Sequence, residues 1–495
     1  MKTEVKEKKK YRSLGINAVL NGIKSGLLIL FPLITYPYAL RVLKPEGIGK
    51  VNYAGTLVGY FGLLASLGIG TYAVREGAKL RDDRQKLQQF ARQIFTINVA
   101  STILAYVALL FCVLFVEKFK MYSVLIFVSS ISILAEVLGT EWINTLYEDY
   151  LFITIRSIVT HLISLVLLFL LIKSEDDYIK YAFLSVLTSV VICLSNMLYC
   201  RRYVTIGLTK QIDLSRHIKP IMVLFANSIA TSIYVSADVT MLGWMCGDYY
   251  VGLYTMAMRV YGVVKKMLVA VYSVAIPRIS LYAGNKDYER LKETYTSVLS
   301  TITMILIPAS AGLIVLSREV VLLIGGREYI DSVATLQLLS LALVGAIFGG
   351  AVTYVLNIPL GREKNNVIAT ILSAIINIIL NIFIIKRFKQ NGAAFTTVIS
   401  EFFVFLFCLF KTKDIKNYVD IKRWLKSILH AGVGVVWIIA VSFTFHLIMQ
   451  NLIAITLSVM AASMVGYAVL LFIMRDEMIV SILNKFSKKR RQEAE

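Results

Sequence analysis

The sequence predicts an all-α integral membrane protein with about 14 transmembrane helices, arranged as two related six-helix lobes followed by two further helices. Three observations lead to this prediction. Apolar residues make up 57% of the 495 residues, only 17% are charged, and the mean hydropathy is +0.71, whereas soluble chains are about a quarter charged. The apolar residues form long runs that leave no room for a large aqueous domain. Two stretches of the chain also repeat the same polar positions.

Each expected span is a run of about 20 predominantly apolar residues, which is the length that crosses the hydrocarbon core as a helix. The runs are continuous and do not alternate, so helices are favoured over a β-barrel. The fourteen runs are 14–40, 51–74, 93–116, 121–146, 151–172, 181–200, 219–242, 251–276, 295–316, 331–356, 366–385, 393–410, 424–448 and 451–474.

The distribution of basic residues predicts the orientation of these helices. With the N-terminus inside the cell, 35 of the 52 Lys and Arg residues fall in cytoplasmic segments and 12 in external ones. Such an excess marks the cytoplasmic side, so both termini are expected there. The net charge of +21 is therefore explained by topology and by lipid contact, for example of the tail Lys488–Arg491, and not by nucleic acid binding.

The spans and loops define the expected organisation of the chain. The two lobes correspond to helices 1–6 and 7–12, and helices 13 and 14 are appended. The expected segments are a basic N-terminus (1–13), an N-lobe (14–200), a cytoplasmic inter-lobe loop (201–218), a C-lobe (219–410), a second cytoplasmic loop (411–423), helices 13 and 14 (424–474) and a basic tail (475–495).

An internal repeat supports the division into two lobes. At an offset of 203, the second helix matches the eighth, with Gly49 opposite Gly252 and Gly59 opposite Gly262. At an offset of 210, Asn17 in the first helix matches Asn227 in the seventh. An even number of helices separates the two lobes, so the repeat is parallel, and its axis lies along the membrane normal. Such repeats predict a cleft and an alternating-access motion.

Polar residues recur at helical spacing within several spans and are expected to line this cleft. A polar side chain in lipid is costly unless it faces protein or water, and helix–helix hydrogen bonding is the alternative explanation. The predicted lining residues are Asn21, Asn52, Asn227, Thr231, Tyr234 and Asn377, together with Asn366, Thr370, Ser373 and Asn381.

Charged residues inside the spans are more specific candidates, because each costs about 2.5–3.5 kcal/mol near the bilayer centre. Lys24, Arg259 and Lys266 form the predicted cationic group, and Arg259 and Lys266 share one helix face. Lys265 is turned away from that face by about 100° and is expected to be a structural or an interfacial residue. A cavity with excess positive charge suits an anion, particularly a phosphate, whereas a cation exporter requires carboxylates.

The acidic residues of the spans are assigned as charge partners or ion-coupling groups. Asp238 and Glu401 are the candidates for ion coupling, and Asp238 is also a candidate partner for one of the cations. Arg156 is expected to pair with Glu136, Glu141 or Glu148. Arg75 and Glu76 are interpreted as local charge pairing or a gate.

The chemistry of several other protein classes is missing from the sequence. No GxxxxGK[ST] loop or GxSxG elbow occurs, so neither ATP hydrolysis by a P-loop nor serine hydrolase chemistry is expected. The five cysteines and four histidines lack metal-ligand or disulfide spacing. We therefore expect no enzyme activity, no cofactor and no metal centre.

Several segments together resemble the Wzx-type polysaccharide flippases, within the group that also contains MATE exporters and lipid II flippases. They are LLASLGIGTYAVREGAK (63–79), EWINTLYEDYLFITIRSIV (141–159), VGLYTMAMRVY (251–261), IPRIS (276–280), LLIGGREYIDSVATLQLLS (322–340), INIILNIFII (376–385) and NGAAFTTVISE (391–401). The resemblance covers residues 12–410.

The resemblance implies a MATE-like fold with a cation-lined central cavity, onto which Lys24 and Arg259 map, and Lys266 less closely. It implies transport of an undecaprenyl-diphosphate-linked oligosaccharide, an O-antigen or capsular repeat unit, from the inner to the outer leaflet of the cytoplasmic (inner) membrane of a bacterium. Helices 13 and 14 would hold the lipid tail. The implied partners are this glycan, membrane lipids, polysaccharide polymerase and chain-length machinery, and a coupling ion, Na⁺ or H⁺.

Three alternatives to a capsule or O-antigen flippase are considered. The first is a flippase for lipid II or a teichoic-acid precursor. The second is a cation-coupled multidrug exporter on the same fold, and the third is a scaffold for polysaccharide assembly. The excess of cations over carboxylates argues against the exporter, and a scaffold has no use for a cationic cavity.

Overall fold

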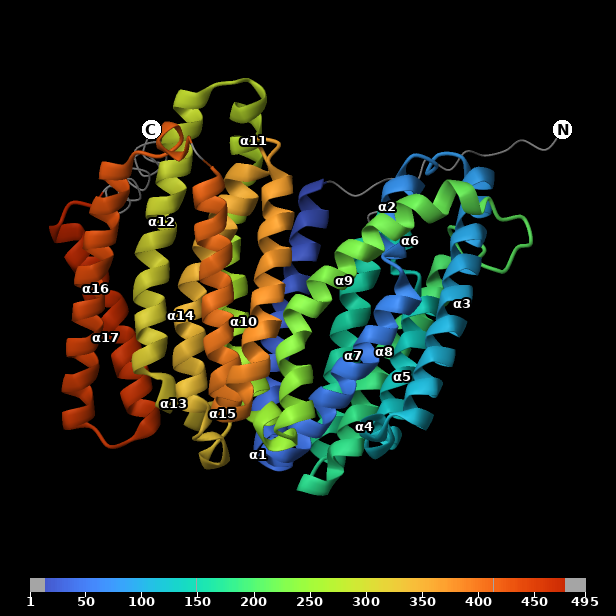
Figure 1. Cartoon of the computed structure of the whole chain (residues 1–495), viewed down its shortest axis with the longest axis horizontal. Coiled ribbons are helices and arrows are strands. Elements are labelled where there is room, and N and C mark those ends of the chain that lie inside the picture. The colour runs from blue at the N-terminus through green and yellow to red at the C-terminus, as the bar shows by residue number, and fades with distance from the viewer. Residues whose placement is uncertain (1–13, 148, 413, 477–495) are drawn as a thin grey trace. The chain divides into compact units, whose positions relative to one another are not determined.

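The computed structural model describes residues 14–147, 149–412 and 414–476, apart from the side chains of 14–21, 23–25, 27–30 and 150. The expected terminal segments 1–13 and 477–495, which include Lys488–Arg491, lie outside the described residues. Within the described residues every regular element is helical, as Figure 1 shows. The contacts divide the chain into two compact units.

The N-terminal unit comprises the residues up to Leu43 and Lys50–Ser232. Its core packs Ile69 and Tyr72 against Leu87, Phe90 and Ile143. Its helices are α1 (Leu14–Ser66), α2 (Ile69–Ala78), α3 (Arg84–Phe115), α4 (Glu117–Met121), α5 (Ser123–Gly139), α6 (Glu141–Leu146), α7 (Tyr150–Leu171), η1 (Glu175–Asp177), α8 (Tyr178–Cys200) and the first part of α9 (Leu214–Met245).

The C-terminal unit comprises Lys44–Gly49 and the residues from Ile233 onward. Its most buried span is α14, which packs against α10, α12 and α15. The elements are α10 (Asp248–Ser273), α11 (Ile276–Gly284), α12 (Tyr288–Val315), α13 (Ser317–Ile324), η2 (Arg327–Tyr329), α14 (Ser332–Gly350), η3 (Ala351–Asn357), α15 (Glu363–Lys411), η4 (Ile415–Asn417), α16 (Ile421–Ile448) and α17 (Leu452–Ile473).

The units divide within α9, between Ser232 and Ile233, whereas the sequence analysis places the inter-lobe loop at 201–218. That loop is present before α9, but the helix itself continues from one unit into the other. The appended helices α16 and α17 lie side by side next to α12 in the C-terminal unit (Figure 1).

Local sequence signals explain where many helices begin. Asp83 directly precedes α3, and its carboxylate accepts a hydrogen bond from the backbone N–H of Lys86, the third residue of the helix. Asp287 caps α12 and Asp420 caps α16 in the same way, and the side chain of Asn451 caps α17. Asp and Asn are favoured at these positions because they satisfy backbone donors that lack an intrahelical partner.

Two of the long helices are broken inside. The backbone of α1 leaves helical geometry at Lys44 (φ 57°, ψ 177°), because the following residue is Pro45, and a proline disfavours the helical conformation of the residue before it. The backbone of α15 breaks at Lys389 (φ 52°, ψ −130°), just before the turn-forming pair Asn391 and Gly392.

The two arms of α15 form a helical hairpin. Arg362, which precedes the helix, makes two hydrogen bonds of 2.7 and 2.8 Å to the carboxylate of Asp414, which follows it. Further inside, the hydroxyl of Ser373 donates to the carbonyl of Ser400 at 2.9 Å. These contacts require the arms to run antiparallel.

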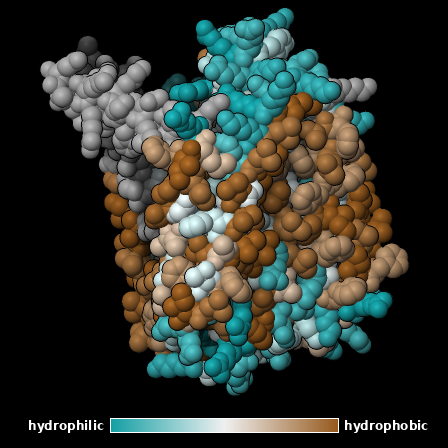
Figure 2. Space-filling model, turned by 90° about the vertical axis from the view of Figure 1, so that its left-hand side faces the viewer, coloured by the Kyte–Doolittle hydropathy of each residue, from teal (hydrophilic) through white to brown (hydrophobic). Residues whose placement is uncertain are grey.

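Within the described residues, 12 helices are long and apolar enough to span a membrane, so the expected count of 14 is not confirmed. The difference arises at the two broken helices. The expected span 14–40 and most of 51–74 fall in α1, with the end of the latter in α2, and 366–385 and 393–410 both fall in α15. The face over α16 and α17 is apolar in its middle and hydrophilic above and below, as expected for a surface in contact with lipid (Figure 2).

A close backbone contact in the C-terminal unit reflects the internal repeat. A Cβ atom added to Gly49 would lie 1.8 Å from the carbonyl oxygen of Asp248, and one added to Gly252 would lie 1.9 Å from that of Pro45. Gly252 and Asp248 are the counterparts of Gly49 and Pro45 at the offset of 203. The two contacts are therefore reciprocal, and each depends on a glycine that lets two backbones touch.

We predict that Gly252→Ala lowers the free energy of unfolding by about 1–3 kcal/mol, the usual cost of overpacking. Gly262→Ala is the matched control on the same helix, because no atom lies within 4 Å of its added Cβ. Alanine favours a helix over glycine by about 1 kcal/mol, so the control should be unchanged or more stable. Thermal unfolding of the purified proteins in detergent measures the difference, and equal stability of both variants would contradict the predicted contact.

Candidate functional site

The cationic residues predicted on the eighth span lie on one exposed face of α10. Arg259 and Lys266 are both exposed and are seven residues apart, which is nearly two full turns. Ser273 continues the same face toward the end of the helix and is exposed too. Lys24 lies in the first arm of α1, but its side chain is outside the described part of the chain, as is that of Asn21.

Lys265 differs sharply from its neighbour Lys266. Its ammonium group lies 2.7 Å from a carboxylate oxygen of Glu401 on α15 and 3.0 Å from the hydroxyl of Tyr261. The Tyr261 hydroxyl also donates to Glu401, which is buried. Lys265 is therefore structural, as expected, and Glu401 serves as its charge partner.

The carboxylate of Asp238 lies at the centre of a buried polar cluster. Tyr254 donates its hydroxyl proton to one oxygen at 2.6 Å, and Thr397 donates to the same oxygen at 2.8 Å. The amide of Asn381 donates to the other oxygen at 2.6 Å. Asp238 is only 5% exposed, and the partners of its carboxylate among the described residues are all neutral, so the expected pairing with a cation is not found.

The cluster extends from Asp238 along both arms of α15. Asn381 also donates to the carbonyl oxygen of the Asn377 side chain at 3.0 Å, and Thr396 donates to Asn381 at 2.5 Å. Three helices, α9, α10 and α15, therefore contribute oxygen atoms around one buried carboxylate. Such a carboxylate is unfavourable in a low-dielectric interior unless it holds a proton or a cation.

The remaining predicted lining residues occupy two kinds of environment. Asn227 and Thr231 are exposed on α9, and Tyr234, one turn further on, is half-buried. Asn52 in the second arm of α1 is half-buried as well. These four positions can contact a polar ligand, whereas Asn377 is buried in the Asp238 cluster.

The polar stripe on the first arm of α15 packs against protein. Asn366 donates to the backbone carbonyl of Thr353 at 2.9 Å and accepts a hydrogen bond from Asn357. Ser373 and Asn381 are fully buried. Here helix–helix hydrogen bonding, the alternative considered above, explains the stripe better than a cavity does.

The charged residues predicted in the N-terminal unit form two different arrangements. Arg75 and Lys79 both contact the carboxylate of Glu76, at 3.0 and 2.8 Å, in a partly exposed local cluster. Arg156 is buried and donates mainly to the side chain of Asn196 at 2.6 Å, whereas its nearest oxygen of Glu141 is 3.9 Å away. Glu148, another expected partner, lies outside the described residues.

Some residues of these clusters were missed at the level of sequence. Asn196 lies in a predominantly apolar run without a recognisable motif, and Tyr254 has no feature that distinguishes it from other aromatic residues of the spans. Both become informative only once their buried partners are known. Outside the spans, hydrogen bonds from Arg362 lower the pKa of Asp414 to about 2. The loop end of the α15 hairpin is therefore closed by an ion pair that persists down to strongly acidic pH.

Comparisons with known families match most of the chain. The family described as "Polysaccharide biosynthesis protein" matches residues 16–283, which is more than half of the chain. A second family, described as "Lipid II flippase MurJ", matches residues 251–465. The two matches overlap over residues 251–283, which include most of α10 and nearly all of α11.

Two curated relatives match along nearly their whole length. Proteins of Shigella dysenteriae and Escherichia coli (strain K12), both named "Putative O-antigen transporter", are 23% and 22% identical to this chain. Each alignment covers 79% of this chain, and covers 98% of the first relative and 94% of the second.

Solved structures share the fold. The lipid II flippase MurJ in an inward closed conformation matches with a TM-score of 0.75 at 16% identity, covering 93% of this chain and all of that one. An inward-facing MATE multidrug resistance transporter of the MOP superfamily matches with a TM-score of 0.58 at 16% identity, covering 81% and 99%. The chain is thus a multi-pass membrane protein of a transporter group and not an enzyme. It belongs to the polysaccharide biosynthesis protein family.

Proposed function

We propose that this protein is a flippase that moves an undecaprenyl-diphosphate-linked oligosaccharide, an O-antigen or capsular repeat unit, from the inner to the outer leaflet of the cytoplasmic membrane. The observation that carries the proposal is the exposed pair Arg259 and Lys266 on one face of a membrane-spanning helix. The family and the O-antigen transporters among its relatives support it. A protein of Haloferax volcanii named "Probable low-salt glycan biosynthesis flippase Agl15" is 26% identical over 181 residues, which is 35% of this chain and 37% of that one.

The physical argument begins with the cost of the two cations. Each would be expensive in contact with lipid tails, so the face of α10 that bears them is expected to meet water and an anionic ligand. A diphosphate matches this face, because guanidinium and ammonium groups are the usual partners of phosphate oxygens. Lys24 is proposed as a third cation at the same site.

The uncharged polar residues are proposed to contact the sugars. Asn21, Asn52, Asn227, Thr231 and Tyr234 offer amide and hydroxyl groups without adding charge. Alternating access would then expose the head group outside while the lipid tail stays in the membrane. An interior-negative potential would favour export of a doubly charged head group by about 4–5 kcal/mol at 100 mV.

We propose that ion coupling, if it accompanies export, occurs at the Asp238 cluster, which includes Asn377. The buried carboxylate and the surrounding amide and hydroxyl oxygens are the ligand types that hard cations such as Na⁺ prefer, and the same carboxylate can take a proton. Glu401, the other candidate for ion coupling, contacts Lys265 at 2.7 Å, which supports Asp238 as the proposed site.

The first prediction concerns export in cells. In a strain that lacks this protein, undecaprenyl-linked intermediates should accumulate on the cytoplasmic side, and wild type should relieve the accumulation. Arg259→Ala should fail to relieve it although the protein is present at normal levels. Lys364→Ala removes an exposed cation at the start of α15 and should behave as wild type. Mass spectrometry of the extracted lipids identifies the sugar, and normal export by Arg259→Ala would contradict the proposal.

The second prediction separates the two adjacent lysines. Lys265→Met leaves Glu401 buried without its partner, which costs about 3–5 kcal/mol for a buried ion pair, so this variant should unfold at a lower temperature. Lys266→Met should keep the stability of wild type but lose export. Thermal unfolding and the export assay, applied to both variants, test this. A loss of stability in Lys266→Met, or none in Lys265→Met, would show that the two environments are wrongly assigned.

The third prediction concerns the ion site. If Na⁺ binds at Asp238, sodium chloride should raise the unfolding temperature of the purified protein relative to choline chloride at equal ionic strength. The gain should reach about 2.7 kcal/mol at a concentration 100 times the dissociation constant. Asp238→Asn should abolish the gain, and Glu401→Gln is the control that should retain it. Stabilisation by acid in place of sodium would identify the ion as a proton, and no response to either would exclude coupling at this residue.

A further inference from the structure

A cavity of about 200 Å³ lies inside the N-terminal unit, away from the residues proposed above to bind the glycan or the coupling ion. Its walls come from α2, α3, α5, α7 and α8 and from the second arm of α1. Most of the lining is apolar, but polar side chains line it as well. They include Ser66, Asn98, Glu136, Thr140, Glu141, Arg156 and Asn196.

Three buried polar atoms in this wall lack a hydrogen-bond partner among the described residues. They are Nε of Arg156, Oγ1 of Thr140 and Oδ1 of Asn98. Arg156 is 7% exposed and Thr140 is 8% exposed. Unpaired buried polar atoms are unfavourable, so their occurrence in the wall of one cavity favours a polar group as its occupant.

The position of the donors and acceptors defines the chemistry of that group. The guanidinium of Arg156, a residue of the cavity wall, donates to Asn196 and has Glu141 at 3.9 Å, while its Nε and the hydroxyl of Thr140 are buried without a partner among the described residues. The carboxylate of Glu136 lines the same cavity and makes no hydrogen bond or ion pair to a described residue, and Asn98 offers an acceptor. The cavity wall thus holds one cation, Arg156, and two carboxylates, of which Glu141 lies 3.9 Å from Arg156. A phosphate beside Arg156 and an ammonium beside Glu136, the two charges of a zwitterion, would complement this lining.

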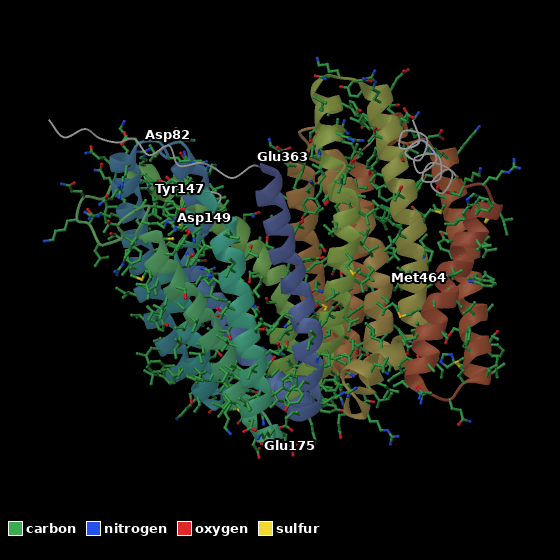
Figure 3. All side chains as sticks on the ribbon, turned by 180° about the vertical axis from the view of Figure 1, so that it is seen from behind. Asp82, Tyr147, Asp149, Glu175, Glu363 and Met464 are labelled. Atoms are coloured by element: carbon green, nitrogen blue, oxygen red, sulfur yellow. The ribbon has the colours of Figure 1, made fainter. Side chains whose placement is uncertain are left out.

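The depth of the site favours a ligand from the membrane surface. Glu136 is three residues from the end of α5 and Arg156 is six residues from the start of α7, about 4.5 and 9 Å along the helices. The C-terminal end of α5 and the N-terminal end of α7 lie on the side of the unit that carries Tyr147 and Asp149 in Figure 3, and Glu175 marks the opposite side. The head groups and the interfacial layer lie near such helix ends. The carboxylates of Glu136 and Glu141 disfavour a purely anionic lipid.

We propose that this cavity binds an aminoalkyl phosphate, the zwitterionic group that forms the head of phosphatidylethanolamine and also exists as free phosphoethanolamine. The phosphate contacts Arg156 and Thr140, and the ammonium donates to Glu136 and Asn98. A trimethylammonium group has no N–H to donate, so phosphatidylcholine is discriminated against. This inference does not depend on the proposed export function, since it concerns binding alone.

The experiment measures lipid retention by the full-length protein. Purified, delipidated protein is equilibrated with micelles containing phosphatidylethanolamine, phosphatidylcholine or phosphatidylglycerol, and bound lipid is counted by native mass spectrometry. We expect wild type to retain phosphatidylethanolamine at least tenfold better than the other two lipids. Glu136→Gln should lose this preference, and Glu117→Gln, an exposed carboxylate of the same unit outside the cavity, should keep it.

Glu136→Gln is the decisive variant, because the Glu136 carboxylate makes no hydrogen bond or ion pair to a described residue that the substitution would break. A substitution of Arg156 would also remove its hydrogen bond to Asn196. Competition by free phosphoethanolamine would show that the head group alone suffices, and binding without such competition would assign the site to the lipid. Equal retention of phosphatidylethanolamine and phosphatidylcholine by wild type would overturn the proposal. An unchanged preference in Glu136→Gln, or displacement of the lipid by a free monosaccharide, would overturn it as well.

Discussion

The cost of a charge within the membrane governs the arrangement of this protein. A charged side chain in a span must find a partner, reach water or hold a ligand, and the charged residues of the described spans differ in their surroundings. Lys265 has a partner in Glu401, and Arg156 is bound by Asn196. Arg259 and Lys266 share an exposed face of α10. Asp238 is buried among neutral donors. The first two contacts stabilise the fold, and the others are the places where function is proposed.

The fold connects these sites through its broken helices. The turn at Lys389 returns α15 along itself, which brings Asn381 and Thr397 of opposite arms to the same carboxylate. The same hairpin carries Glu401 to Lys265. On α10, Gly252 allows the close backbone contact near one end, while Arg259 and Lys266 lie further along the helix. One hairpin therefore supports both the structural ion pair and the proposed ion site.

Much of this could be predicted from sequence, because the signals are local or periodic. Apolar runs locate the spans, and the offset of 203 relates Gly49 to Gly252 before any contact is known. The different surroundings of Lys265 and Lys266 follow from helical geometry. The membership in the polysaccharide biosynthesis family was also predicted, from segments in a consistent order along the chain.

Other features could not be predicted, because they depend on which helices meet. A polar stripe has the same spacing whether it faces water or another helix. The spacing of the stripe that begins at Asn366 therefore predicts a cavity, whereas its side chains pack against protein within the C-terminal unit. Asp238 was expected beside a cation, yet its partners come from distant positions in α10 and α15. The cavity beside Arg156 depends on Asn98, Thr140 and Glu136, three residues that no sequence motif connects.

The most direct test of the central claim is transbilayer movement by the purified protein. Proteoliposomes would contain a polyprenyl-diphosphate-linked oligosaccharide, and a glycan-cleaving enzyme added outside would report how much of it becomes accessible over time. Our account predicts that wild type makes the inner pool accessible and that Arg259→Ala does not. If wild type leaves the inner pool protected, or if Arg259→Ala moves the lipid equally fast, a flippase acting through this cationic face is contradicted.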